Sequence, residues 1–142
     1  MTSERAARVK GYFEALTPEA VERMGEVYAA DAYFRDPFNE VKGLEAIQGI
    51  FRHMYDPLVD PRFVILETIE EGDRLVLTWD MLFRIRKYKP EVERRIHGLS
   101  LLRFAPDGRI AWHRDYWDAA GELYAQLPLV GPLMRFLAKK MG

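Results

Sequence analysis

The chain has 142 residues, which is enough for one domain with a buried core. Apolar residues make up 49% and charged residues 30%, a balance typical of a folded globular protein and not of a disordered one. The 21 basic and 22 acidic side chains nearly cancel, so no overall charge favours nucleic acid or an anionic membrane as a partner. No cysteine is present, which excludes disulfides, thiolate metal ligands and a cysteine nucleophile.

The sequence also lacks the usual marks of export and of metal binding. The first ten residues contain no apolar signal segment, and no apolar run approaches the roughly 20 residues of a membrane span. The histidines His53, His97 and His113 are scattered without metal-binding spacing. We therefore expect a cytoplasmic protein with a single domain over residues 1–142, needing no metal and no cofactor.

The first half of the chain has the periodicity of helices. A first helix is predicted by apolar residues at helical spacing. Thr17 and Pro18 suit the start of a second helix over residues 17–32. A short strand over residues 32–38 stops at Pro37, and residues 43–55 form a third amphipathic helix. The buried face of the first helix consists of Val9, Tyr12, Phe13 and Leu16.

The second half changes to the alternating pattern of strands. Residues 62–88 predict two strands joined at Gly72, and residues 93–118 predict two more, joined by a turn at residues 105–108. The tail over 119–142 returns to helix and should close part of a pocket or pack beside its mouth. Three helices followed by an antiparallel meander predict an α+β fold, in which helices cover the concave face of a curved, cup-shaped sheet. Such a cup has an apolar interior suited to a small molecule.

The stretch FRDPF places the carboxylic acid Asp36 among apolar residues. Asp-Pro often initiates a turn, so Asp36 has a simple structural explanation. The alternative is a partly dehydrated carboxylate that transfers protons.

The last two predicted strands carry further candidates. Alternation puts His113, Asp115 and Trp117 on one side of the last strand, and periodicity alone leaves open whether that side faces the cup. In the strand over 75–85 the apolar side should line the core, which turns Asp80 away from it.

The order of the segments VYAADAYFRDPF, GLEAIQGIF and LLRFAPDGRIAWHRDYWD resembles that of the nuclear transport factor 2-like superfamily. The resemblance is strongest to the branch of ketosteroid isomerase and the SnoaL-like polyketide cyclases. It implies a cone-shaped, cystatin-like α+β barrel around one apolar pocket. Residues HRDYWD also resemble the limonene epoxide hydrolase-like branch, although its Arg-x-Asp is replaced here by residues 78–80, Thr-Trp-Asp.

The resemblance also implies roles for individual residues. Asp36 would be the general base, Tyr12 would donate to the developing oxyanion, and Ser100 stands where ketosteroid isomerase has a second, acidic donor. His113 and Asp115 would face inward and relay or orient. The walls would come from Phe34, Phe38, Trp79, Met81, Phe83 and Trp117.

We expect from these features a hydrophobic small-molecule ligand and proton-transfer chemistry. The substrate would be a hydrophobic carbonyl or enone compound, steroid-, polyketide- or terpenoid-like, that is isomerised or cyclised. The alternatives are a binding protein for a hydrophobic ligand without catalysis and, less favoured, an epoxide hydrolase-like enzyme. The uncovered face of the sheet predicts a homodimer. Its expected contacts are Val76, Leu82, Trp112 and Tyr116.

Overall fold

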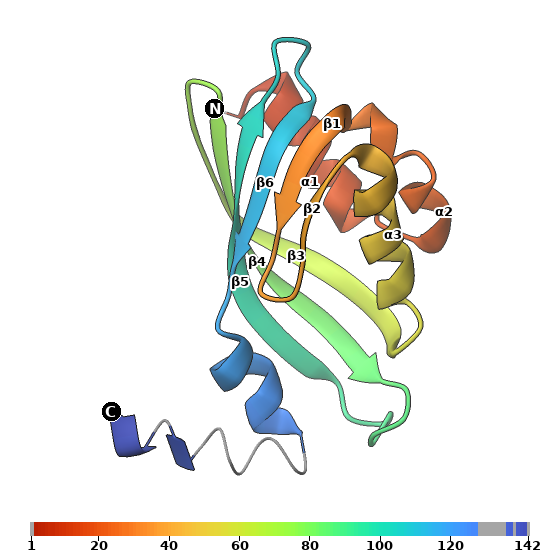
Figure 1. Ribbon diagram of the computed structural model, residues 1–142, viewed down its shortest axis with the longest axis vertical. Helices are drawn as coiled ribbons and strands as arrows, with labels where there is room; N and C mark the ends of the chain where they lie inside the picture. Colours follow the sequence, from red (N-terminus) through yellow and green to blue (C-terminus); the bar gives the residue numbers. More distant parts are fainter. Residues whose placement is uncertain (1, 128–135, 138, 142) are drawn as a thin grey trace.

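The computed structural model describes residues 2–127, 136–137 and 139–141, and shows a curved sheet wrapped around helices (Figure 1). The six strands lie in the order β2-β1-β6-β5-β4-β3. Neighbouring strands are antiparallel except β1 and β6, which are parallel. The α+β cup is thereby confirmed. The strands are β1 (Tyr28–Arg35), β2 (Glu40–Lys42), β3 (Leu58–Glu71), β4 (Arg74–Ile85), β5 (Arg94–Phe104) and β6 (Ile110–Tyr116).

Three α-helices cover the concave face of the sheet: α1 (Glu4–Glu14), α2 (Pro18–Val21) and α3 (Leu44–Met54). Thr17 caps α2 as predicted, because its hydroxyl accepts a hydrogen bond from the Ala20 backbone N–H at 3.1 Å. Val9 and Phe13 of α1 are buried together with Leu77 and Phe83 of β4, so the core lies between helices and sheet. No helix within the described residues is long and apolar enough to cross a membrane.

The predicted helix over residues 17–32 is wrong beyond Val21. A 3₁₀ turn, Met24–Glu26, follows α2, and Tyr28 already belongs to β1. The reason is long-range pairing: Ile110 donates its backbone N–H to the Val27 carbonyl at 2.7 Å, and Tyr28 lies in register with Ile110. Tertiary pairing with β6 therefore overrides the local helical pattern.

Three smaller differences concern the other connections. The strand β3 begins at Leu58, four residues before the start of the segment 62–88 that was predicted to form strands. The short strand β2 was not predicted. In the tail, Ala119–Leu123 form a π-helical turn and Tyr124–Gln126 a 3₁₀ turn, whereas most of the predicted closing helix lies outside the described residues.

Candidate functional site

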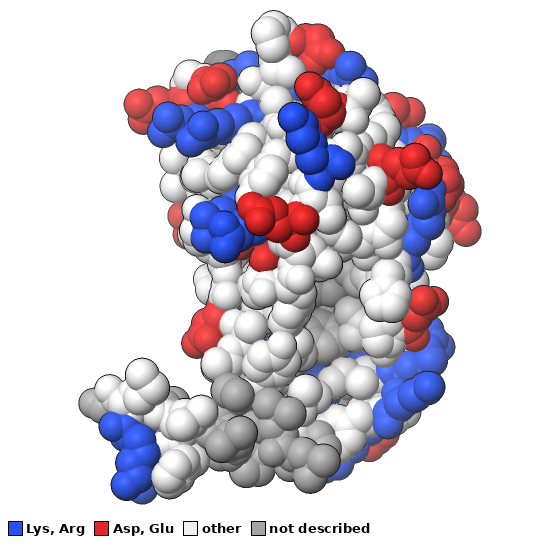
Figure 2. All heavy atoms as spheres, in the orientation of Figure 1, with Lys and Arg blue, Asp and Glu red and all other residues white. Residues whose placement is uncertain are grey.

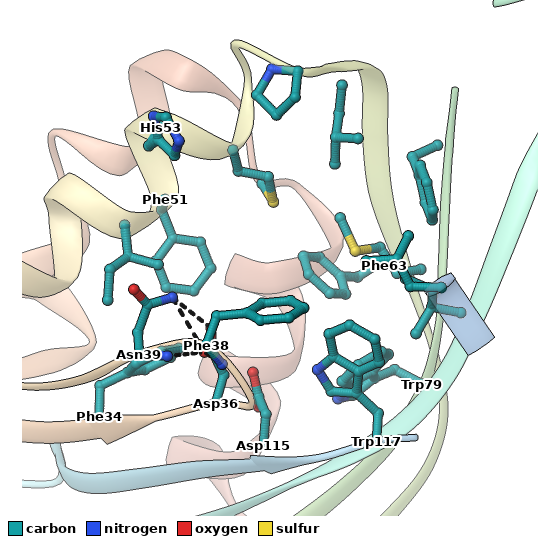
Figure 3. Close-up of a pocket in the computed structure, with 18 of the residues that line it drawn as sticks. Phe34, Asp36, Phe38, Asn39, Phe51, His53, Phe63, Trp79, Asp115 and Trp117 are labelled. Atoms are coloured by element: carbon teal, nitrogen blue, oxygen red, sulfur yellow. Dashed lines mark hydrogen bonds between the residues drawn. The ribbon is translucent and has the colours of Figure 1, made fainter. Parts of the chain in front are cut away.

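A cavity of about 670 Å³ opens between α3 and the concave face of the sheet (Figure 3). Its size is within the range of sites that hold drug-sized ligands. The wall is mainly apolar, and its polar side chains are Asp36, Asn39, His53 and Asp115. The six predicted wall residues all line it: Phe34, Phe38, Trp79, Met81, Phe83 and Trp117.

Asp115 on β6 presents a carboxylate to this cavity, and its two oxygens differ. Oδ1 accepts a hydrogen bond from the Ser100 hydroxyl at 2.5 Å and lies 2.6 Å from Nε2 of His113. For Oδ2 no partner is found among the described residues. The Asp115 side chain is only 17% exposed, so the free oxygen faces a confined apolar space.

His113 connects Asp115 to a phenol in the core. Its side chain is 3% exposed, and its Nδ1 lies 2.6 Å from the Tyr28 hydroxyl. The rings of Tyr28 and His113 are stacked, with centroids 5.9 Å apart. Tyr28, His113 and Asp115 therefore form one hydrogen-bonded chain that leads from the core to the cavity.

The pKa of Tyr28 determines where the protons lie in the hydrogen-bonded chain of Tyr28, His113 and Asp115. Burial and the nearby charge of Asp115 raise the pKa of the Tyr28 phenol well above its usual value. The phenol therefore keeps its proton, and its O–H group donates a hydrogen bond to Nδ1 of His113. The hydrogen-bond pattern then assigns a neutral imidazole with its proton on Nε2, which donates to Asp115.

Asp36 also lines the cavity, but its carboxylate holds the turn between β1 and β2. Oδ1 accepts hydrogen bonds from the backbone N–H groups of Phe38 and Asn39, at 2.8 and 2.7 Å. The Asn39 side-chain amide donates to both carboxylate oxygens (Figure 3). The geometry is that of the Asp-Pro turn considered as the simpler explanation.

Tyr12 lies outside the cavity, contrary to its expected place beside Asp36. Its hydroxyl donates to the carbonyl of Ala20 in α2 at 2.6 Å. Burial raises the pKa of Tyr12 to about 12. The side chain belongs to the contact between α1 and α2, because α1 points this face toward α2 and not toward the sheet.

Ser100 lies behind Asp115 and not in the main wall. The Trp79 indole N–H donates to the Ser100 hydroxyl at 2.9 Å, and that hydroxyl in turn donates to Asp115. These three residues and His113 border a second, small cavity of about 30 Å³. Ser100 therefore positions the carboxylate in this structure, and its only acceptor among the described residues is Asp115.

Asp80 and Thr78 lie on the outer face of β4, as the alternation of β4 predicts. Asp80 pairs there with His97 of β5, with Nδ1 and Oδ1 2.9 Å apart. The side chains that stand in place of the epoxide hydrolase Arg-x-Asp therefore point away from the cavity. No group of three or more potential metal-ligating side chains is found in the described part of the chain.

Two residues of the site were missed from the sequence. Tyr28 was placed on a helix, so nothing connected it with His113. Asn39 follows the Asp-Pro pair, and its amide is a common partner of a turn aspartate. That local pattern could have indicated Asn39, whereas Tyr28 depends on the parallel pairing of β1 with β6.

Comparisons with solved structures agree on the fold. A protein with a ketosteroid isomerase-like fold from Catenulispora acidiphila, solved with trimethylamine, is 20% identical with a TM-score of 0.75, over 90% of this chain and 96% of that one. A SnoaL-like polyketide cyclase from Shewanella denitrificans is 20% identical with a TM-score of 0.70, over 88% and 100%. An M. tuberculosis LEH-like epoxide hydrolase is 18% identical with a TM-score of 0.69, over 94% and 96%.

No curated protein matches the chain. The family model of the SnoaL-like domain, in contrast, matches residues 9–113, which run from the middle of α1 through the turn at Asp36 to His113. The cup-shaped sheet and the structural neighbours have the nuclear transport factor 2-like fold that the sequence motifs resemble. The chain belongs to the SnoaL-like domain family.

Proposed function

We propose that this protein transfers a proton within a hydrophobic carbonyl compound, as an isomerase or cyclase, with Asp115 as the group that takes and returns the proton. The observation that supports this most is the asymmetry of the Asp115 carboxylate. One oxygen is held by His113 and Ser100, and the other faces the apolar cavity. A positioned carboxylate in a dry cavity is the usual arrangement of a general base.

The proposed step begins with a C–H bond next to the substrate carbonyl. Asp115 Oδ2 takes the proton, and the C–H electron pair forms an enolate. In an isomerisation the same carboxyl group returns the proton to another carbon. In a cyclisation the enolate carbon bonds to a second carbonyl carbon, whose C=O π electrons move to its oxygen, and that oxygen takes the proton back from Asp115 to become a hydroxyl group. The proton balance closes without an oxidant, a reductant or a second substrate.

Trp117 is the proposed donor to the enolate oxygen. It lies two residues after Asp115 and lines the same cavity wall (Figure 3). Its indole Nε1 has no hydrogen-bond partner among the described residues. An N–H group aimed at developing negative charge stabilises the transition state more than the ground state.

The chain from Tyr28 through His113 has the proposed role of holding Asp115 in one orientation. A neutral His113 donates to Asp115 without cancelling its charge, so the carboxylate keeps its capacity to accept a proton. Asp36 has the proposed supporting role of fixing the turn that carries Phe38, whose ring lies 5.6 Å from that of Trp117 at the cavity. A general base of this kind contributes about 10² to 10⁴ in rate.

Deuterium exchange tests the proposal without knowledge of the substrate. The protein is incubated in D₂O with a panel of hydrophobic β,γ-unsaturated ketones, and deuterium incorporation is followed by NMR. We expect incorporation above the buffer rate for at least one ketone, and loss of about 10² or more of that rate in Asp115→Asn. Asn keeps an oxygen for Ser100 and His113, so this variant should still fold and bind the ketone.

The alternative is a binding protein without catalysis, and the apolar wall of the cavity supports it equally well. The same experiment separates the two functions. Ketones that bind, seen as shifts of the tryptophan fluorescence, but take up no deuterium would support the binding protein and contradict the enzyme.

We also propose that the protein is a homodimer that uses the outer face of the sheet. No helix in the described part of the chain covers this face (Figure 1). Several of its apolar side chains remain exposed in one chain. A second copy would cover them. Light scattering at micromolar concentration should give twice the chain mass, and Ile69→Glu should give the monomer mass; a wild-type monomer would contradict the proposal. The exposed residues are Val64, Leu66, Ile69 and Tyr116.

A further inference from the structure

Arg94 is a buried cation on the concave face of the sheet. It is the first residue of β5, and alternation places it on the same face as Ile96 and Ser100. It lies opposite Phe83 of β4, which lines the large cavity together with Ile96. Its exposed fraction is 9%. Arg94 therefore neighbours two lining residues of the cavity, at the end remote from Asp115, without being part of the wall itself.

Protein groups orient the guanidinium but do not neutralise it. Nη1 donates to the Gln126 side-chain oxygen at 3.2 Å, and the guanidinium carbon lies 5.1 Å from the centre of the Tyr88 ring. Nε is buried and has no hydrogen-bond partner in the described structure. Both partners are uncharged, so the positive charge of Arg94 is not compensated by them, and its buried Nε–H is an unused donor.

No carboxylate of the described residues lies within ion-pair distance of this charge. Among the described residues Arg94 makes no ion pair, and the neighbouring Glu93 is bound to Arg62. The sequence after Glu122 contains no aspartate or glutamate, so the residues outside the description add no acidic side chain. Buried charges are normally paired, because an unpaired one loses its hydration without compensation. The counter-charge of Arg94 is therefore missing among the described residues.

We propose that Arg94 binds the carboxylate of an elongated hydrophobic acid whose body fills the cavity. The length of the ligand follows from the strand register. Asp115 lies opposite Ser100, and Arg94 is six residues before Ser100 on the same strand, so Arg94 and Asp115 are about 20 Å apart along the sheet. The acids Asp36 and Asp115 repel an anion, so the carboxylate lies at the Arg94 end. This deepens the proposed function, because it rests on the cavity as the ligand site and names the class of ligand.

The surface near Arg94 favours the same class of ligand. The segment from Arg84 to Arg95 carries six basic and two acidic side chains. Figure 2 shows Lys and Arg side chains gathered along the edge of the hollow, over the hairpin of β4 and β5. A positive potential at the entrance raises the local concentration of anions and attracts them at low ionic strength.

Binding of dodecanoate and of dodecanol tests this proposal, because the two probes have alkyl chains of equal length and differ in the head group, a charged carboxylate against a neutral hydroxyl. Dissociation constants are measured by displacement of a fluorescent apolar dye from the wild type, Arg94→Met, Arg94→Gln and Arg95→Met. We expect the wild type to prefer the acid. Arg94→Met and Arg94→Gln should weaken dodecanoate roughly tenfold to a hundredfold, with dodecanol unchanged.

Arg95→Met is the matched control. Arg95 is the next residue, loses the same charge, and points to the outer face, where its side chain is 67% exposed. We expect it to change either dissociation constant less than about threefold, because exposed charges are screened. Without ligand, Arg94→Met should melt no lower than the wild type, since it removes an unpaired buried charge.

Three results would overturn the proposal: equal affinity of the wild type for acid and alcohol, equal effects of the Arg94 and Arg95 variants, or no binding of either probe. Asp115→Asn separates this proposal from the proton-transfer function. It should bind dodecanoate at least as tightly as the wild type while losing deuterium exchange. Loss of the acid preference in the Arg94 variants alone therefore supports the anion site, even if no ketone is exchanged.

Discussion

Replacement of Tyr28 by phenylalanine removes one oxygen atom from the centre of the hydrogen-bonded chain. Tyr28 is fully buried, and its ring contacts with His113 and Phe13 are retained by phenylalanine. Among the described residues the hydroxyl has one hydrogen-bond partner, Nδ1 of His113, which is left without a donor in a side chain that is 3% exposed. An orphaned buried acceptor costs about 1–3 kcal/mol, so Tyr28→Phe should lower the free energy of unfolding by that amount near neutral pH.

The pH dependence of this loss has a definite sign. Because the folded-state pKa of Tyr28 is raised, the folded protein keeps a proton that the unfolded chain releases above its ordinary pKa of about 10. The stability that Tyr28 contributes is fully present below that pKa. Above it, the wild type loses up to about 1.4 kcal/mol per pH unit from this residue, and the phenylalanine variant does not. The difference between the two proteins should therefore shrink as the pH rises above about 10.

Urea unfolding followed by tryptophan fluorescence measures both effects. Tyr33→Phe is the matched control, because Tyr33 lies on the same strand and donates to Glu40 at an exposed position. The control should change the free energy of unfolding by less than about 0.5 kcal/mol. A Tyr28→Phe variant as stable as the wild type at neutral pH would refute the hydrogen-bonded chain from Tyr28 to Asp115.

Two further predictions concern packing and the contact between helices. Gly98→Ala should cost about 1–3 kcal/mol and alter tryptophan fluorescence, because a Cβ there would lie 2.7 Å from Trp79 and 2.8 Å from Trp117. Gly49→Ala in α3, where a Cβ meets nothing within 4 Å, should instead stabilise by about 0.5–1 kcal/mol; a loss comparable to that of Gly98→Ala would contradict the packing. Tyr12→Phe should cost about 0.5–1.5 kcal/mol at neutral pH through its lost backbone hydrogen bond. It should reduce the alkaline loss of stability that the wild type shows from pH 10.0 to about 12, and leave deuterium exchange unchanged; impaired exchange would restore Tyr12 as a participant.

Much of the fold could be predicted because its signals are local. The cap at Thr17, the period of α3 and the turns at Gly72 and Gly108 all depend on neighbouring residues. The boundary at residue 27 could not be predicted in this way. The segment that follows fits either period, and its pairing with β6, more than 80 residues later, decides for a strand.

In the candidate site too, local features could be predicted from the sequence and features that depend on long-range pairing could not. The inward side of β6, with His113, Asp115 and Trp117, was available from alternation once the family resemblance chose the face. The different roles of Asp36 and Asp115 could not be predicted from the sequence, because they depend on which hydrogen-bond donors surround each carboxylate. Asp36 meets donors of its own turn, a local feature that the Asp-Pro pair already indicated. Asp115 meets Ser100 of the neighbouring strand, and only the register of β5 with β6 brings these two together.

The most direct test of Asp115 as the base compares Asp115→Asn with Asp36→Asn in one deuterium-exchange experiment on the same ketone. Both variants remove one carboxylate from the cavity and keep its shape, so they differ only in which acid is lost. We predict that Asp115→Asn loses about 10² or more of the exchange rate. Asp36→Asn should stay within about threefold of the wild-type rate, because its amide oxygen still accepts the turn hydrogen bonds. The reverse order, with exchange lost in Asp36→Asn and kept in Asp115→Asn, would contradict the assignment of Asp115 as the base.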